Sequence, residues 1–305
     1  GVGPGGRNIP HREKVEVAPS TIPARSPEVA TDNEVFTPPF LGVEIVKGIP
    51  LDDIAPYINE TAIFRNQWQF RPEAGEDDAA FKDRLRPQLR QIIAECKAAD
   101  LLVPQVVYGY FAANSIGNDL VIWTDETRTA ELARFSYPRQ QTEPWLCIAD
   151  FFRAYDPTAP EGERGDLDYA AFQIVTMGER ISEHCAQLFA DDRYQDYLMM
   201  HGIGVEMAEA LAEYWHHRVR TEWGFVDEDG PSLAGLFRQK YRGGRYSSGY
   251  PACPDLEDNA TVNELLDGGR IGIEVNEDTG WQYQPEQTTS ALICHHPRAK
   301  YFVAR

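Results

Sequence analysis

Two apolar runs that lie close together in the chain constrain its fold most. Residues 106–111 and 120–123 are rich in β-branched and aromatic residues, and the polar segment 114–119 separates them. Such runs favour extended strands, and a short polar connection between them is typical of a β-hairpin, whose two strands are antiparallel. Further strand-like runs are found at 42–46, 132–137, 169–176, 291–294 and 301–304.

Helical signals flank these strands and bunch in the later part of the chain. Apolar residues recur at helical spacing over 81–99, and apolar stripes predict two more helices at 180–199 and 205–223. A short helix is expected at 233–241, and another should begin at Thr261, because a glutamate follows three residues later in the spacing of a capping box. Strands in hairpin-like clusters and helices bunched together favour an α+β fold over a regular βαβ alternation. We expect a twisted antiparallel β-sheet with flanking helices.

The charge and the apolar pattern exclude several partners. The 305 residues hold 29 lysines and arginines against 48 aspartates and glutamates, a net charge of −19. Because nucleic-acid binding needs clustered positive charge, no nucleic-acid partner is expected. No apolar run approaches the roughly 20 residues that span a bilayer, so no membrane partner is expected either. Five widely spaced cysteines suit reduced thiols and predict a cytoplasmic protein.

Residues 1–38 differ from the rest of the chain. They contain scattered glycines and prolines and few large apolar residues, a composition typical of a linker or tail. We therefore expect an interdomain linker or tail over 1–38 and one folded domain over 39–305, a length that one large domain can reach.

The most distinctive polar segment is Arg245–Pro254. Its sequence RYSSGYPACP places an arginine four residues before a Gly-Tyr pair, and two prolines follow. Glycine admits backbone conformations closed to other residues and proline fixes its own φ, so a shaped loop that approaches a ligand is expected. Arginine matches a carboxylate and tyrosine offers a flat face with a polar tip, which suits an amino-acid-like metabolite with an aromatic part. An arginine that pairs with a nearby carboxylate to hold an irregular turn would explain the same residues.

Other chemistries fit the candidate residues poorly. A Tyr-Pro pair stands where a phosphate-binding loop needs Lys and Ser/Thr, and neither Ser247 nor Ser248 has the two flanking glycines of a nucleophile elbow. The histidine pairs 216–217 and 295–296 lack the spacing of zinc ligands. We therefore expect no catalytic residue and no metal site in this chain.

The segment Arg245–Pro254 closely resembles the Arg-x-x-x-Gly-Tyr-Pro-Ala-Cys-Pro element of the activation domain of cobalamin-dependent methionine synthases. The resemblance extends from about Thr37 to Arg305 and includes further matches in the same order. These matches are Asp125–Arg128, Arg139–Glu143, Ala208–Ala210, Ala212–Tyr214, Glu264–Leu266 and His296-Pro297 followed by Lys300-Tyr301. Several separate matches make coincidence an inadequate explanation, and the chain is identified as a member of this family.

This resemblance implies a binding site for S-adenosylmethionine. Arg245 would pair with the carboxylate of the ligand, Glu209 would offset its positive charge, and aromatic faces would lie near its adenine or sulfonium. The residues that the resemblance implies for the site are Arg245, Ser247, Tyr250, Tyr301, Phe302, Glu209, Asn59 and Gln239. The last two stand where relatives carry acidic residues, and this exchange predicts weaker binding of S-adenosylmethionine than in those relatives.

The resemblance also implies a role in reactivating cobalamin. In the family, this domain presents the methyl group of S-adenosylmethionine when cobalamin has oxidised to its inactive cob(II)alamin form. A reduced flavodoxin-like protein or a flavoprotein reductase supplies one electron. Cobalamin and zinc would belong to other modules of the same polypeptide, since this chain has no cobalamin-ligating Asp-x-His-x-x-Gly motif. The chain would be a methyltransferase fragment that does not turn over alone; the alternative is a non-catalytic module of the same fold that senses a nucleotide or docks a flavoprotein.

Overall fold

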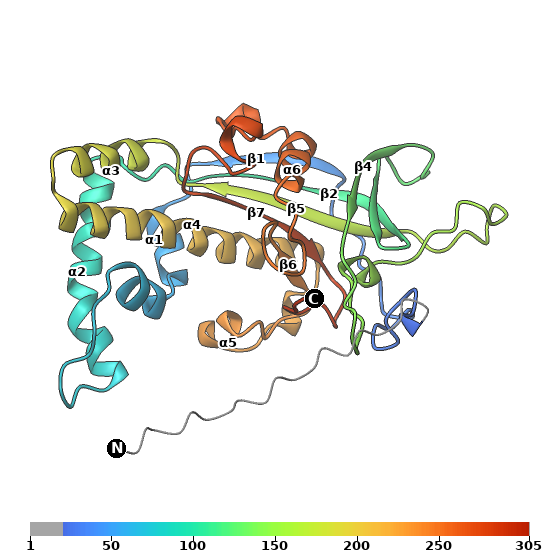
Figure 1. The fold of residues 1–305 in the computed structure, drawn as a ribbon, viewed down its shortest axis with the longest axis horizontal. Helices are drawn as coiled ribbons and strands as arrows, with labels where there is room; N and C mark the ends of the chain where they lie inside the picture. Colours follow the sequence, from blue (N-terminus) through green and yellow to red (C-terminus); the bar gives the residue numbers. More distant parts are fainter. Residues whose placement is uncertain (1–20, 305) are drawn as a thin grey trace, which may run out of the picture.

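The computed structural model describes residues 21–304, and its strands form a seven-stranded antiparallel sheet (Figure 1). The order of the strands is β4-β3-β2-β5-β7-β6, and β1 also pairs with β2. The strands are β1 (Gly42–Lys47), β2 (Gln105–Ile116), β3 (Asp119–Trp123), β4 (Glu131–Ser136), β5 (Asp168–Thr176), β6 (Gly244–Tyr246) and β7 (Thr288–Cys294). The predicted antiparallel sheet and the hairpin of β2 and β3 are confirmed, with a two-residue turn at 117–118.

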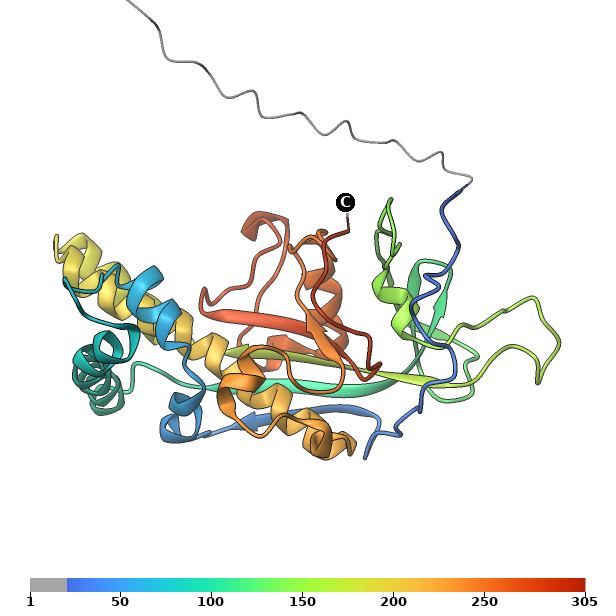
Figure 2. The ribbon, with the colours of Figure 1, turned by 90° about the horizontal axis from the view of Figure 1, so that it is seen from below.

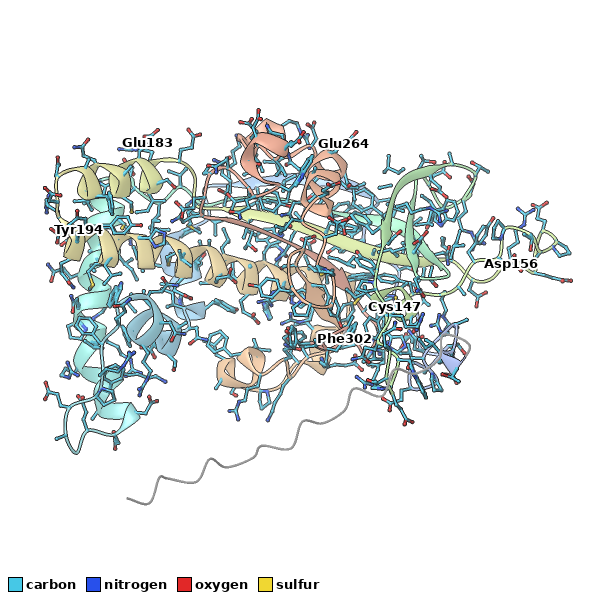
Figure 3. The ribbon with its side chains drawn as sticks, in the orientation of Figure 1. Cys147, Asp156, Glu183, Tyr194, Glu264 and Phe302 are labelled. Atoms are coloured by element: carbon cyan, nitrogen blue, oxygen red, sulfur yellow. The ribbon has the colours of Figure 1, made fainter. Side chains whose placement is uncertain are left out.

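Helices cover the sheet and extend beyond one of its ends. They are α1 (Leu51–Ile54), α2 (Asp78–Ala98), α3 (Arg180–Ala190), α4 (Tyr194–Trp223), α5 (Leu233–Phe237) and α6 (Asp258–Leu266), with a π-helix at Ala62–Gln67. Figures 1 and 2 show α2 and α3 at one end of the molecule and β4 at the other. In Figure 3, Glu183 and Tyr194 mark the first end and Asp156 the second. Over residues 21–304, none of the helices combines the length and the apolarity required to cross a membrane.

The sheet has an apolar core on each face. In β2, Tyr108 and Tyr110 pack in a core with residues of α4, whereas Val107 and Phe111 pack in a second core with residues of α6. This alternation follows because successive side chains of a strand point to opposite faces. Strand β5 is buried along its whole length, and β2 along all but its ends. Two covered faces explain why the sequences of these strands are predominantly apolar.

Helix α4 corrects the predicted helix boundaries. The apolar stripes predict helices at 180–199 and 205–223, but α3 ends at Ala190 and α4 runs without a break from Tyr194 to Trp223. Gly202 lies inside α4, and a Cβ atom at this position would come within 2.9 Å of side-chain atoms of Gln67 and Trp68. The glycine therefore permits close packing against the π-helix and its following residue, and it does not mark a helix end.

Three shorter predictions are also wrong. Helix α6 begins at Asp258, so Thr261 lies inside it and the predicted capping box does not form. The helix predicted at 233–241 ends at Phe237, and Gln239 then adopts a left-handed φ of 57° that turns the chain. Residues 301–304 form no strand.

The described part of the predicted linker, residues 21–38, contacts the domain, while the first twenty residues lie outside the described range. The backbone N–H of Ser26 donates to Asp150 Oδ2 at 2.9 Å. Trp223 Nε1 on α4 donates to the carbonyl of Phe36 at 2.8 Å. The domain boundary at residue 38 stays a prediction, and these bonds make the preceding segment part of the packed structure.

Candidate functional site

Strand β6 directs Arg245 toward the sheet face that α4 covers. Arg245 lies opposite Ile293 of β7, and Ile293 packs in the same core as α4. Residues that face each other across paired strands point to the same side, so Arg245 points to α4 and the next residue, Tyr246, points into the opposite core. The predicted irregular loop thus begins as a short strand, and strand pairing sets the direction of the guanidinium.

Two side chains of α4 meet the Arg245 guanidinium. Glu213 Oε2 lies 2.6 Å from Nη2, and His216 Nδ1 lies 3.1 Å from Nη1. The Arg245 side chain is 23% exposed and that of Glu213 is 9% exposed. Burial lowers the pKa of Arg245, but the negative charge of Glu213 and other nearby groups raise it, and the net pKa lies above its ordinary value. The carboxylate pairing foreseen as an alternative is therefore present, and it leaves the charged arginine partly accessible.

Gly249 shapes the turn that follows β6. Its φ of +93° lies in the left-handed region that side chains disfavour. The Gly249 N–H donates to the carbonyl of Cys253, and the Cys253 N–H donates to the carbonyl of Tyr250, both at 2.9 Å. Ser247 Oγ donates to the carbonyl of Ser290 on β7 at 2.7 Å. These bonds fix the Gly-Tyr turn beside Arg245.

Six of the eight residues that the resemblance implies line one pocket of about 230 Å³. They are Glu209, Gln239, Arg245, Ser247, Tyr250 and Tyr301. Tyr250 and Tyr301 are 58% and 57% exposed, so their apolar faces contact water in this structure. A ligand with a flat apolar part would cover them, which is favourable.

Acidic residues of α4 face the same pocket. Glu209 and Glu213 are four residues apart, and this spacing places them on one helix face. Glu213 is buried beside Arg245, with 7% of its surface exposed, whereas Glu209 is exposed. The pocket therefore offers an accessible carboxylate near a guanidinium, an arrangement complementary to a zwitterion.

The structure does not bring Asn59 and Phe302 into this pocket. Asn59 lines a neighbouring pocket of about 660 Å³, and Phe237 borders both pockets. Asn59 Oδ1 accepts a bond from the backbone N–H of Ala62 at 3.0 Å, at the first residue of the π-helix. Phe302 is buried and packs edge-on against Tyr246 in the core opposite α4. A hydrogen bond to the backbone therefore accounts for Asn59, and core packing accounts for Phe302.

Three side chains at the site were not foreseen from the sequence. Glu213 and Tyr241 line the pocket, and His216 contacts Arg245. Glu213 follows Glu209 at helical spacing, so the periodicity of this helix could have found it. His216 follows Glu213 by three residues, so the same helical spacing places it on this face, whereas Tyr241 reaches the site only through the tertiary fold.

The thiol that borders the pocket is not arranged as a nucleophile. Cys253 Sγ donates to the carbonyl of Ser247 at 2.9 Å, and burial raises the pKa of this thiol to about 12. A protonated thiol is a poor nucleophile. Within residues 21–304, no group of three or more His, Cys, Asp or Glu side chains is placed to hold a metal ion. The side chains of the pocket are suited to binding and orienting a charged metabolite.

Comparison with known protein families gives one extended match. Residues 50–305 match the family described as vitamin B12 dependent methionine synthase, activation domain. The chain is 43% identical to the methionine synthase of Mycobacterium tuberculosis (strain ATCC 25618 / H37Rv) and 41% identical to that of Mycobacterium leprae (strain TN). Each alignment covers 97% of this chain and 25% of the relative, so the chain spans about a quarter of the length of these proteins.

A solved structure has the same fold. The crystal structure of the MetH reactivation domain bound to AdoHcy superimposes with a TM-score of 0.76 at 29% sequence identity. The match covers 88% of this chain and 82% of that domain.

Proposed function

Because this chain belongs to the activation-domain family of vitamin B12-dependent methionine synthases, we propose that its pocket binds S-adenosylmethionine. The observation that carries the proposal is the convergence of Arg245, Glu209 and two exposed tyrosines on one pocket. The similar MetH reactivation domain was crystallised with AdoHcy, which is S-adenosylmethionine without the transferable methyl group. That ligand presents the carboxylate, ammonium and adenine that such a pocket complements.

Each pocket residue has a role that follows from its chemistry. Arg245 would donate to the ligand's carboxylate, since its side chain is partly exposed and lines the pocket. Glu209, exposed at the same wall, would accept from the ammonium and offset the positive sulfonium. Tyr250 and Tyr301 would cover the adenine or face the sulfonium with their π-electrons. Gln239 borders the pocket and would offer an amide oxygen to a ligand hydroxyl or ammonium.

We further propose that the bound methyl donor serves cobalamin reactivation in a full-length methionine synthase. Cobalamin, held by another module of the same polypeptide, would supply the low-valent cobalt that accepts the methyl group, after a reduced flavoprotein has supplied one electron. This chain would bind the donor, orient its sulfonium methyl outward and exclude misaligned poses. The leaving sulfur becomes neutral as the methyl departs, so no protein acid or base is required. A cytoplasmic location and an interdomain connection through residues 1–38, of which residues 21–38 pack on the domain, are part of the same proposal.

Calorimetric titration with S-adenosylmethionine tests the binding step. Arg245→Ala should weaken binding about 10- to 100-fold, because hydrogen bonds to a charged group are lost. Arg298→Ala is the matched control: Arg298 pairs with Glu28 at 2.9 Å on the exposed surface, outside the pocket. Equal affinities of the wild type and both variants would refute the role of Arg245, and absence of binding to the wild type would refute the proposed ligand.

A reactivation assay tests the second step. The chain is added to the remainder of a methionine synthase whose cobalamin has been oxidised, together with S-adenosylmethionine and a reduced flavodoxin. We expect turnover to return with the wild-type chain and to stay low with Arg245→Ala. Binding of S-adenosylmethionine without any recovery of turnover would favour a non-catalytic sensing or docking module of the same fold.

A further inference from the structure

The Arg245 guanidinium is held from one side by two acceptors on α4. Glu213 Oε2 contacts Nη2 at 2.6 Å, and His216 Nδ1 contacts Nη1 at 3.1 Å. Residues three apart on a helix share a face, which is how both acceptors reach one guanidinium. Arginine has five N–H donors, so these two contacts leave three for other partners.

The contact with His216 fixes the state of that imidazole. A guanidinium can only donate, so Nδ1 must carry the lone pair and the proton of the neutral ring resides on Nε2. His216 is fully buried, with the ring of Tyr241 edge-on at 4.9 Å. Burial lowers the pKa of His216, and the positive charges of Arg220, Arg245 and Lys300 and the neighbouring His217 lower it further, well below its usual range. An imidazolium would repel Arg245 at this distance, so the histidine serves as a neutral acceptor.

Glu213 complements this neutral acceptor with a charged one. Its Oε2 atom balances the arginine charge, while its Oε1 atom is buried with no partner among residues 21–304. A carboxylate on Nη2 and an imidazole on Nη1 fix the plane of the guanidinium as well as its position. A planar donor group that is fixed in this way loses little freedom when a ligand binds.

We propose that His216 and Glu213 are positioning residues that hold Arg245 in the plane required to grip the carboxylate of the ligand. They act through Arg245 and do not touch the ligand's carboxylate themselves. The inference rests on the proposed function, because the ligand's carboxylate is the group whose recognition they serve. Residues of α4 therefore contribute, together with Arg245 of β6, to the preference for a ligand that carries a carboxylate.

The test compares two ligands that differ only in the carboxylate: S-adenosylmethionine and decarboxylated S-adenosylmethionine. Affinities are measured by calorimetry. In the wild type, S-adenosylmethionine should bind more tightly. His216→Leu removes the acceptor at similar size and should weaken S-adenosylmethionine about tenfold, while the affinity for the decarboxylated ligand changes less than about twofold. His216→Asn keeps an acceptor near the position of Nδ1 and should restore the preference for the carboxylate.

Matched variants separate positioning from folding. His217→Leu makes the same change one residue along α4, at a half-exposed ring 4.0 Å from Asp229, and should leave both affinities unchanged. Equal weakening of both ligands by His216→Leu would overturn the inference, because a merely structural residue does not distinguish them. If His216→Leu does not fold, Glu213→Gln provides the same ligand comparison, with weaker binding of S-adenosylmethionine alone as the expected result.

A measurement on the wild-type chain adds a test that needs no variant. Nitrogen-15 NMR of the imidazole near pH 7 should show His216 protonated on Nε2 and unprotonated on Nδ1, and a proton on Nδ1 would overturn the inference. If the wild type binds neither ligand, the proposed function fails. If it prefers S-adenosylmethionine and His216→Leu keeps that preference, only the positioning role fails.

Discussion

Arg139 and Arg245 each pair with a carboxylate, yet their surroundings differ. Arg139 donates to both oxygens of Asp150 at 2.7 and 2.5 Å, twice to Asn118 Oδ1, and to the carbonyl of Trp145. The side chains of Arg139 and Asp150 are only 4% and 2% exposed. Arg245 makes two contacts with α4, its side chain is 23% exposed, and it lines the pocket.

The difference shows that an arginine can stabilise the fold in one region, as Arg139 does, and be available to bind a ligand in another, as Arg245 is. Arg139 has five bonds for its five donors, so it has nothing left to offer a ligand. Arg245 is held firmly by two acceptors but not saturated. A binding arginine in this fold is therefore recognised by its unused donors, since both arginines are charged and both contact a carboxylate.

The largest expected effect is on stability. Arg139→Ala leaves Asp150 buried without its cation and should lower the free energy of unfolding by about 3–5 kcal/mol. Arg134→Ala on β4 is the control: its pair with Asp119 at 2.8 Å is exposed to solvent, and the loss should stay below about 1 kcal/mol. Urea unfolding measures both. If Arg139→Ala cost no more than Arg134→Ala, the structural role of Arg139 would be refuted.

A buried carboxylate without any arginine gives the next largest effect. Burial raises the pKa of Glu206 on α4 from 4.5 to about 7, although a bond from Gln67 at 3.3 Å lowers it in part. The folded chain thus holds this proton more tightly than the unfolded chain does. The stabilisation is fully present below about pH 4.5 and is lost as the pH rises to about 7, a change of about 2–3 kcal/mol.

Glu206→Gln should remove the contribution of Glu206, because an amide does not titrate, and the contribution of Asp258, whose pKa burial also raises to about 7, should remain. Unfolding free energies between about pH 4.5 and 8 measure it, and the exposed Glu183→Gln on α3 is the control. A variant that kept the wild-type slope over this range would show that another group is responsible.

The smallest effect concerns charge in the pocket. Gln239→Glu adds a negative charge at the pocket wall and should tighten binding of the positively charged S-adenosylmethionine about threefold. Asn59→Asp should change the affinity less than about twofold, because this residue lines the neighbouring pocket and its side chain accepts from the N–H of Ala62, a bond that an aspartate oxygen can also accept. Calorimetric titration of both variants with S-adenosylmethionine measures these affinities. A larger increase in affinity for Asn59→Asp than for Gln239→Glu would indicate that the ligand extends across both pockets.

Local patterns account for the parts of the fold that could be predicted. The hairpin of β2 and β3 follows from two apolar runs and a short polar turn, and helix α2 from periodicity near 81–99. Helix α4 could not be bounded in this way, because Gly202 fits against Gln67, a contact that lies far away in the sequence. The unusual composition of the segment around Arg245 made it predictable as a binding loop. His216 was considered only as a zinc ligand, and its spacing from other histidines did not support a zinc site.

The amino-acid sequence by itself determined the antiparallel sheet, the family and the Arg245 segment, because strand periodicity, turn chemistry and a ten-residue motif are local properties. The tertiary structure decided which partners Arg245 has and which donors it keeps free. Arg245 stands 29 residues from His216 in the chain, and only the pairing of β6 with β7 across from α4 brings the guanidinium to those acceptors. The orientation of a charged side chain, and the number of its hydrogen-bond donors that are already used, depend on packing between elements that are distant in the sequence. A local sequence pattern does not determine either property.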